Sequence, residues 1–171
     1  MEQGKTKAKS LLRFFLCTIL LVGIDQAAKQ AAQQMLRSKG AFPIIPGVFE
    51  LLYLENTGSA FGLMQGKKYL FLAMAGLMLV FIPYIYARIP LERRFRYLRM
   101  IAVLFLSGAV GNAIDRMING NVIDFFYFSL IDFPVFNIAD IYVTVSTFLL
   151  IVLMLFYYKD EDFEQIHIFS K

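Results

Sequence analysis

Long apolar runs separated by short polar segments dominate the chain. Four runs are long enough to cross a membrane as helices, and they cover residues 11–28, 69–87, 98–114 and 138–158. As a helix, the last run would extend about 31 Å at about 1.5 Å per residue, which matches the thickness of a bilayer core. Residues 41–54 instead mix β-forming residues with Pro and Gly, which predicts either short strands at the membrane surface or a plain interfacial loop.

Composition places the chain in a membrane. Of the 171 residues, 58% are hydrophobic and 18 are Phe, which is far too apolar for a soluble domain of this size. We therefore predict an all-α integral membrane protein with four transmembrane helices and a small extracytoplasmic β-element. Residues 1–171 are predicted to form a single membrane domain.

Basic residues predict the orientation of the spans. Lys and Arg in short segments beside transmembrane helices collect on the cytoplasmic side of the membrane. In this chain they cluster before the first span and between the second and third: Lys5, Lys7, Lys9, Arg13, Arg88, Arg93, Arg94, Arg96 and Arg99. Both termini are therefore predicted to be cytoplasmic, with residues 29–68 and 115–137 facing outward.

The first span has a second interpretation, because a basic start, an apolar run and the small residues Ala27 and Ala28 are typical of a secretory signal peptide. Arg13 interrupts the apolar run, and Asp25 and Lys29 disturb the region where cleavage would occur. We therefore favour an uncleaved first helix.

Two carboxylates, Asp124 and Asp140, stand where apolar segments enter or leave the membrane. An Asp at the centre of a membrane helix costs roughly 2.5 to 3.5 kcal/mol, so carboxylates kept near membrane depth indicate a functional site. When two carboxyl groups lie close together, one retains a proton, and the pair can then act as acid and base. Such a pair can hydrolyse a peptide bond without a metal ion.

Helical spacing groups further polar residues near these carboxylates. Asp25 and Lys29 are four positions apart at the outer end of the first span, where they can form an ion pair or contact a lipid phosphate. Asn112, Asp115 and Arg116 share one face of the third span. We expect Arg116 either to neutralise Asp115 or to hold a substrate carbonyl or phosphate.

Polar residues in two other segments complete the candidate site. Asn56 and Gly58 belong to a glycine-rich turn whose amide and backbone groups can approach a peptide closely. Asn137 precedes Asp140 by three residues, and Thr144 and Thr147 continue the same stripe along the fourth span. This stripe is expected to face other helices.

His167 and Cys17 are the single His and the single Cys of the chain. His167 lies in the predicted cytoplasmic tail, away from the aspartates, which argues against a Ser/His/Asp triad and a His-based zinc site. Cys17 cannot form an internal disulfide. We expect neither a metal ion nor a cofactor.

Five motifs occur in the order that lipoprotein signal peptidases show: Asp-Gln-x-x-Lys, Asn-x-Gly-x-Ala-Phe-Gly, Gly-Asn-x-x-Asp-Arg, Val-Ile-Asp-Phe and Phe-Asn-x-Ala-Asp. Over nearly its whole length the chain resembles this family, the type II signal peptidases of bacteria. The resemblance implies an aspartyl endopeptidase that removes the signal peptide from prolipoproteins, cutting immediately before a diacylglyceryl-modified cysteine.

The resemblance also assigns roles to residues. It implies that Asp124 and Asp140 form the catalytic dyad and that residues 41–60 form the outer β-element. The remaining positions match family residues that line, order or support the site: Asn56, Gly58, Asn112, Asp115, Arg116, Asn137, Asp25 and Lys29.

Location and partners follow from the same resemblance. It implies a multi-pass protein of the bacterial cytoplasmic (inner) membrane, with its active site near the outer leaflet. Diacylated prolipoproteins and membrane lipid are the expected partners. We expect no nucleic acid and no obligate protein partner, and the chain is expected to be a monomer.

Several alternatives stay open on the sequence. Ile-Asp-Phe occurs twice, so Asp132 competes with Asp124 as the partner of Asp140, and the motif spacing favours Asp124. The carboxylates could instead serve an ion or proton relay, or merely pair helices in a membrane scaffold. A serine protease would use Ser59 with a lysine base, Lys67 or Lys68.

Overall fold

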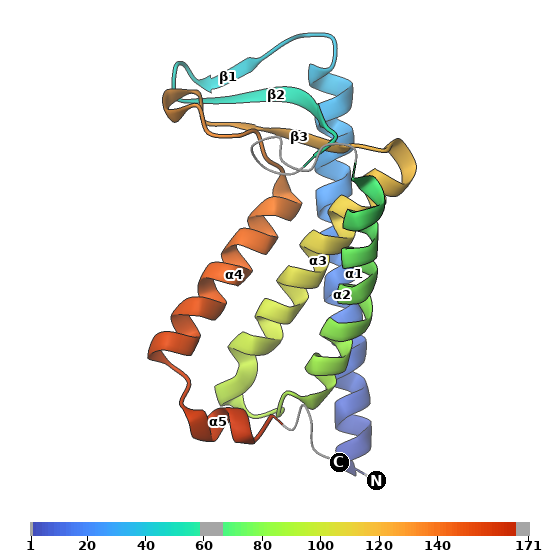
Figure 1. Ribbon diagram of the computed structural model, residues 1–171, viewed down its shortest axis with the longest axis vertical. Coiled ribbons are helices and arrows are strands. Elements are labelled where there is room, and N and C mark those ends of the chain that lie inside the picture. The colour runs from blue at the N-terminus through green and yellow to red at the C-terminus, as the bar shows by residue number, and fades with distance from the viewer. Residues whose placement is uncertain (1, 59–66, 167–171) are drawn as a thin grey trace.

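Four long helices form the body of the molecule (Figure 1). The structure is a computed structural model that describes residues 2–58 and 67–166, with side chains from residue 6 onward. The helices are α1 (Glu2–Leu36), α2 (Lys68–Arg88), α3 (Arg96–Asn119) and α4 (Ile138–Phe156). Each is long and apolar enough to cross a membrane. Together with the small sheet, they confirm the predicted fold class.

A three-stranded antiparallel sheet closes one end of the bundle (Figure 1). Its strands are β1 (Phe42–Ile45), β2 (Phe49–Asn56) and β3 (Val122–Tyr127), with β2 in the middle. The first two strands lie within the predicted segment 41–60. The prediction left out β3, although the β-branched and aromatic residues of Val122–Tyr127 are typical of a strand.

The opposite end of the bundle carries the arginine-rich connection between α2 and α3 and a short helix. A 3-10 turn, Arg93–Phe95, leads into α3, and α5 (Asp160–Glu164) follows α4. Arg94 donates to both carboxylate oxygens of Asp162 at 2.5 and 2.6 Å, which ties α5 to the start of α3. A second 3-10 turn, Ser129–Ile131, lies beyond β3 near the sheet.

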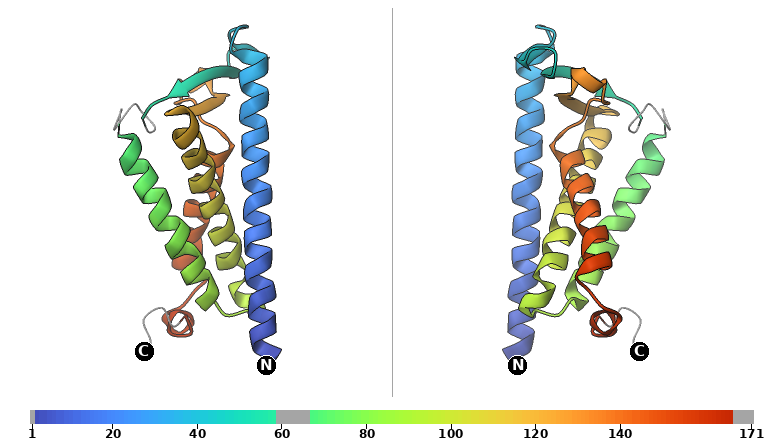
Figure 2. Two further views of the ribbon diagram at one scale, coloured as in Figure 1. Left: turned by 90° about the vertical axis from the view of Figure 1, so that its right-hand side faces the viewer. Right: turned by 90° about the vertical axis from the view of Figure 1, so that its left-hand side faces the viewer.

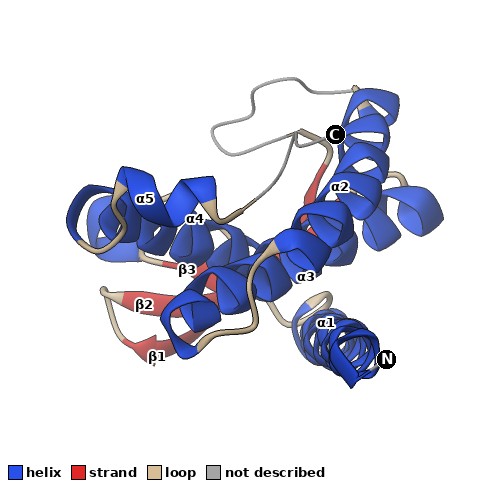
Figure 3. Ribbon diagram, turned by 90° about the horizontal axis from the view of Figure 1, so that it is seen from below, coloured by secondary structure: helices blue, strands red, loops and turns tan. Residues whose placement is uncertain are grey.

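Helix α3 is the central helix, and it contacts each of the other three (Figures 2 and 3). The outer surface of the bundle is apolar, with exposed residues such as Leu20, Val80 and Phe148. Its interior instead holds charged side chains, including Asp25 and Lys29, which are 0% and 2% exposed. An apolar surface around a partly polar interior is the arrangement that lipid, rather than water, favours as the surrounding solvent.

Two glycines of α3 allow its close approach to neighbouring helices. A Cβ added at Gly108 would lie 2.5 Å from the carbonyl oxygen of Ala139 and 2.6 Å from Cγ2 of Val143, both on α4. A Cβ added at Gly111 would lie 2.6 Å from Oδ2 of Asp25 on α1. Small residues at such crossings permit the helix contact that membrane bundles depend on.

The predicted polar stripe of α4 is wrong for its threonines. Thr144 and Thr147 are exposed, and the hydroxyl of Thr147 donates to the carbonyl of Val143 in its own helix at 2.7 Å. A threonine can satisfy its hydroxyl within the helix, so it needs no neighbouring helix. Ser146 is the fully buried hydroxyl residue of this helix.

Candidate active site

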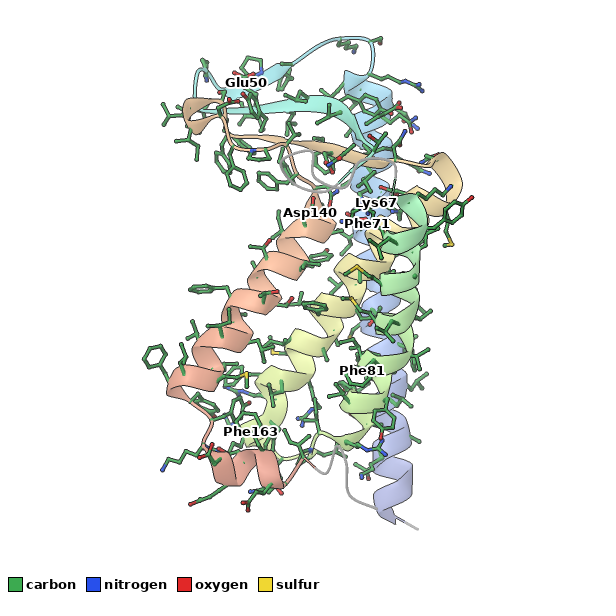
Figure 4. All side chains as sticks on the ribbon, viewed as in Figure 1. Glu50, Lys67, Phe71, Phe81, Asp140 and Phe163 are labelled. Atoms are coloured by element: carbon green, nitrogen blue, oxygen red, sulfur yellow. The ribbon has the colours of Figure 1, made fainter. Side chains whose placement is uncertain are left out.

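Asp140 lies in the first turn of α4, at the end of the bundle that carries the sheet (Figure 4). Asn137 and Asp140 form a capping box, in which each side chain satisfies the other residue's backbone N–H. The backbone N–H of Asp140 donates to Asn137 Oδ1 at 3.0 Å, and that of Asn137 donates to Asp140 Oδ2 at 3.1 Å. The local sequence thus fixes this carboxylate at a helix N-terminus, where the helix dipole stabilises negative charge.

Asp124 lies on β3 and is 1% exposed. The pairing of β2 with β3 sets Asn56 opposite Val122, and Asn56 Nδ2 donates to Asp124 Oδ2 at 2.8 Å. The other carboxylate oxygen of Asp124 accepts from Asn137 Nδ2 at 2.6 Å. Asp124 is therefore buried, and side-chain amides from β2 and the start of α4 satisfy its two oxygens.

Two asparagines link the carboxyl groups of Asp124 and Asp140. Asn137 caps Asp140 and donates to Asp124, as described above. Asn112 on α3 donates from Nδ2 to Asp140 Oδ1 at 2.8 Å, and its own oxygen accepts from Asn137 Nδ2 at 3.1 Å. Side chains of α3, β3 and α4 thus meet in one hydrogen-bonded network.

The surroundings of Asp124 favour its neutral form. Burial raises the pKa of Asp124 from 3.8 to about 7, and the nearby charge of Asp140 contributes in the same direction. The hydrogen bonds from Asn56 and Asn137 and the charge of Lys29 lower this pKa only in part. A carboxyl group with a pKa near neutrality can exchange a proton at physiological pH, as general acid–base catalysis requires.

A buried cluster of charges lies beside this network. The ion pair expected between Asp25 and Lys29 is present, with Nζ and Oδ2 2.9 Å apart. Lys29 Nζ also lies 2.9 Å from Asp115 Oδ2, and it donates to Asn112 Oδ1 at 2.9 Å. The buried lysine therefore joins both carboxylates of the cluster to the asparagine that contacts Asp140.

Backbone contacts hold this charge cluster against the elements that carry Asp124 and Asp140. Asp25 Oδ1 accepts from the backbone N–H of Ala139 at 2.9 Å, and Asp115 Oδ2 accepts from that of Ile123 at 3.3 Å. Gln26 donates to Asp115 Oδ1 at 2.9 Å and to the carbonyl of Gly111 at 3.2 Å. Gln26 was not among the predicted site residues, although its position next to Asp25 in the first motif could have indicated a role.

Arg116 makes other contacts than those predicted. In the described part of the chain, Lys29 rather than Arg116 is the cation in contact with Asp115. Arg116 Nη2 donates to the carbonyl of Gly58 at 2.7 Å, and its guanidinium lies 4.2 Å from the ring centroid of Phe71 on α2. Of the two alternatives for Arg116, direct pairing with Asp115 is not what the structure shows, because Lys29 on α1 forms that ion pair. The other alternative, that Arg116 holds a substrate carbonyl or phosphate, stays a prediction.

The turn after β2 is held from two sides. The backbone N–H of Gly58 donates to Asn56 Oδ1 at 2.9 Å, while its carbonyl accepts from Arg116. These contacts fix the orientation of the Asn56 amide, so that its nitrogen faces Asp124. Ser59, the alternative nucleophile, lies outside the described residues, as does His167.

Asp132 lies outside this hydrogen-bonded network. It is exposed, its φ of 48° lies in the left-handed region, and it ends the 3-10 turn beyond β3. Its Oδ1 accepts from the hydroxyl of Tyr127 at 2.6 Å. Among the described residues, no group of three or more His, Cys, Asp or Glu side chains is placed to hold a metal ion.

Comparison with known proteins identifies the family. A family model described as signal peptidase (SPase) II matches residues 17–156. A lipoprotein signal peptidase of Clostridioides difficile (strain 630) is 41% identical over 144 residues, which cover 84% of this chain and 95% of that protein. One of Streptococcus pyogenes serotype M6 is 35% identical over 150 residues, covering 88% and 95%.

The chain belongs to the signal peptidase II family. Solved structures agree with this membership: one bacterial membrane enzyme is 28% identical with a TM-score of 0.74, covering 84% of this chain and 87% of that one. A second is 27% identical with a TM-score of 0.72, covering 85% and 94%. The matched range 17–156 contains every predicted site residue, from Asp25 to Asp140.

Proposed function

We propose that this protein is a membrane aspartyl endopeptidase that removes the signal peptide from prolipoproteins, cutting immediately before a diacylglyceryl-modified cysteine. Family membership supports the reaction and the substrate class. The observation that carries the catalytic assignment is the link between Asp124 and Asp140, whose carboxyl groups share the side chain and backbone of Asn137.

Two adjacent carboxyl groups can supply the chemistry without a cofactor. One group, ionised, takes a proton from water as the water attacks the scissile carbonyl carbon, and the other donates a proton to the carbonyl oxygen. Amide donors on every carboxylate oxygen hold the pair in place before substrate binds. Such preorganisation lowers the reorganisation needed in the transition state.

The distribution of charge supports an active site near the outer leaflet. More of the described basic side chains belong to segments at the end of the bundle opposite the sheet than to the sheet end, where Arg37, Lys39, Lys67 and Lys68 lie. Those at the opposite end are Lys7, Lys9, Arg13, Arg88, Arg93, Arg94, Arg96, Arg99 and Lys159. By the positive-inside rule that end is cytoplasmic, and the sheet and the dyad then lie on the outer side. We place the protein in the bacterial cytoplasmic membrane as a monomer, with both termini inside.

Exposed apolar residues of the sheet suit the lipid part of the substrate. Phe42, Ile44 and Ile45 on β1 are all more than 45% exposed, at 59%, 49% and 53%. Apolar side chains at this level would enter the headgroup layer, where a diacylated cysteine is held. The scissile bond of such a substrate would then lie at the depth of Asp124 and Asp140.

The arrangement of buried charge favours a protease over a proton relay. In the described ranges, the buried charged residues lie near the two ends of the bundle: Asp25, Lys29, Asp115, Arg116 and Asp124 near the sheet, and Asp162 at the other end. Between them, the buried polar residues are the hydroxyl residues Thr18, Ser107 and Ser146. A relay needs titratable groups distributed along its path.

A gel-shift assay on purified protein tests this function. The parent chain is expected to cleave a diacylglyceryl-modified precursor and to cleave the same precursor poorly when it lacks the lipid. Asp140→Asn should be inactive on both, while its melting temperature in detergent shows that it remains folded. Equal cleavage with and without lipid would refute the substrate assignment, and an active Asp140→Asn would refute the dyad.

A further inference from the structure

Lys29 fixes the orientation of the amide that contacts Asp140. Its ammonium group has three donors and no acceptor, and it faces three oxygens at 2.9 Å: Asp25 Oδ2, Asp115 Oδ2 and Asn112 Oδ1. The Asn112 side chain therefore cannot flip without placing its NH2 group against a cation. Its nitrogen must point away from Lys29, toward Asp140 Oδ1, at 2.8 Å.

Both oxygens of Asp140 consequently face donors that cannot become acceptors. One donor is the Asn112 amide, oriented by a buried cation, and the other is the backbone N–H of Asn137 at 3.1 Å. Asp140 also occupies the first turn of α4, where the helix dipole favours an anion. The position of Asp140 therefore stabilises its ionised form in three ways.

Asp124 has weaker support for a negative charge. Its two donors, from Asn56 and Asn137, are neutral side-chain amides, and neither amide contacts a cation among the described residues. Asp124 lies on a strand, which has little dipole of its own. Its pKa, raised to about 7 chiefly by burial, agrees with a group that retains its proton.

The charges around Asp124 and Asp140 indicate that one of the two carboxyl groups keeps a proton. The titratable and charged groups that face it come from α1, α3, β3 and α4: Asp25, Lys29, Asp115, Arg116, Asp124 and Asp140. With all six ionised, four negative charges would face two positive ones inside an apolar bundle. Neighbouring buried carboxylates relieve such an excess by holding a proton.

We propose that Lys29 is a positioning residue which acts through Asn112 to keep Asp140 ionised, so that Asp140 is the general base and Asp124 the proton-carrying acid. This inference rests on the proposed function, because it assigns the two roles within the proposed dyad. It also gives the buried cluster of Asp25, Lys29 and Asp115 a part in the reaction besides holding helices together.

The assignment gives a balanced reaction. Water forms a bond to the scissile carbonyl carbon, its proton passes to Asp140, and the proton of Asp124 passes to the carbonyl oxygen. The resulting tetrahedral intermediate loses its C–N bond as the proton on Asp140 moves to the leaving amine. Asp124 recovers a proton from one hydroxyl of the intermediate, which becomes the new carboxyl group. Both aspartates then have their starting protonation.

Infrared spectroscopy on the purified protein at neutral pH tests the assignment without any substrate. The carbonyl stretching band of a buried protonated carboxyl is expected in the parent and in Asp140→Asn, and it should be missing in Asp124→Asn. A band that persists in Asp124→Asn and disappears in Asp140→Asn would reverse the roles. Because this readout needs no cleavage, it stays informative even if the proposed substrate is wrong.

The pH profile of cleavage tests the role of Lys29. In the charge-balanced variant Lys29→Met with Asp115→Asn, the acidic limb of the profile is expected to move to higher pH by roughly one unit, because Asp140 loses an oriented donor. Asn112→Ser removes the same donor and keeps the ion cluster, so it should show the same shift of the acidic limb. This variant tests the role of Lys29 even if the first variant does not fold.

The surface pair Arg37→Met with Glu55→Gln serves as the matched control. If the role of Lys29 were purely structural, the variants would have a lower maximum rate of cleavage and an acidic limb at the same pH as the parent. That result in a folded variant would overturn the proposal.

Discussion

The side chain of Asn137 donates to the carboxylate of Asp124 across 2.6 Å, while its oxygen caps the helix that carries the second carboxylate. One amide thus spans the two halves of the proposed dyad, and its orientation is fixed because the backbone N–H of Asp140 can only donate. Amides suit this task, since a single side chain offers both a donor and an acceptor.

Replacing Asn137 should therefore damage both stability and catalysis. Asn137→Ala removes a helix cap, which costs about 1 kcal/mol, and leaves an oxygen of buried Asp124 without its donor. We expect a lower melting temperature in detergent and a loss of cleavage far beyond what the destabilisation explains. Asn121→Ala is the matched control, because the bond of Asn121 to Glu55 is exposed. Equal effects of the two variants would contradict this role.

The close approach of α3 to its neighbours predicts a second set of effects. Gly108→Ala would force its new methyl group against the Ala139 carbonyl and Val143, and overpacking of this kind costs about 1 to 3 kcal/mol. The start of α4 carries Asp140, so cleavage should fall as well. Gly76→Ala on α2 is the control, since no atom lies within 4 Å of the added Cβ. Thermal unfolding of both variants in the same detergent makes the comparison, and a stable Gly108→Ala would contradict the packing.

Ionisation of Asp124 should make the folded protein less stable as the pH rises, the opposite of what a carboxylate in an ion pair does. Its pKa is higher in the folded protein, about 7, than the ordinary 3.8, so the folded state binds more protons between these values. Stability should therefore fall as the pH rises through this window, by at most roughly 4 kcal/mol, and level off above it. Asp124→Asn should remove this part of the pH dependence and be relatively more stable at pH 8. Parallel pH profiles of melting temperature for parent and variant would contradict the shifted ionisation.

At the opposite end of the bundle, the contact between Arg94 and Asp162 should contribute stability without affecting chemistry. Arg94 holds the pKa of Asp162 down at about 2, so the ionised carboxylate stabilises the fold above 3.8 and loses this effect as the pH falls toward 2. Asp162→Asn should lower the melting temperature at neutral pH and cleave normally. Glu161→Gln, an exposed neighbour on α5, is the control. A change in cleavage rate by Asp162→Asn would show that this end of the bundle influences the dyad.

The four spans could be predicted because an apolar run of sufficient length has few alternatives to a membrane helix. Their ends were less accurate: α1 continues to Leu36, eight residues past its predicted end at residue 28, since the helix extends beyond the apolar run to support β2 and β3. The third strand was not predicted, although its residues favour β structure. Only its place in the sheet was out of reach, because that place depends on pairing with β2 and with Phe136.

The residues of the candidate site could largely be named from the motifs, whereas the contacts between them could not. Sequence spacing correctly paired Asp25 with Lys29 on one helix. It could not show that Lys29 also reaches Asp115 on α3, and it left pairing with Asp115 open as one of two roles for Arg116. Contacts between helices depend on how the helices cross, and the glycines that set this crossing, Gly108 and Gly111, resemble many other glycines of membrane spans.

The most direct test of the central claim is the rate at which Asp124→Asn and Asp132→Asn cleave a lipidated precursor. Both variants exchange a carboxylate for an amide within the same outer segment, and Asn tolerates the left-handed conformation of Asp132. We predict that Asp124→Asn loses roughly a thousandfold or more in rate and stays folded, while Asp132→Asn stays within about twofold of the parent. An inactive Asp132→Asn beside an active Asp124→Asn would contradict the dyad of Asp124 and Asp140.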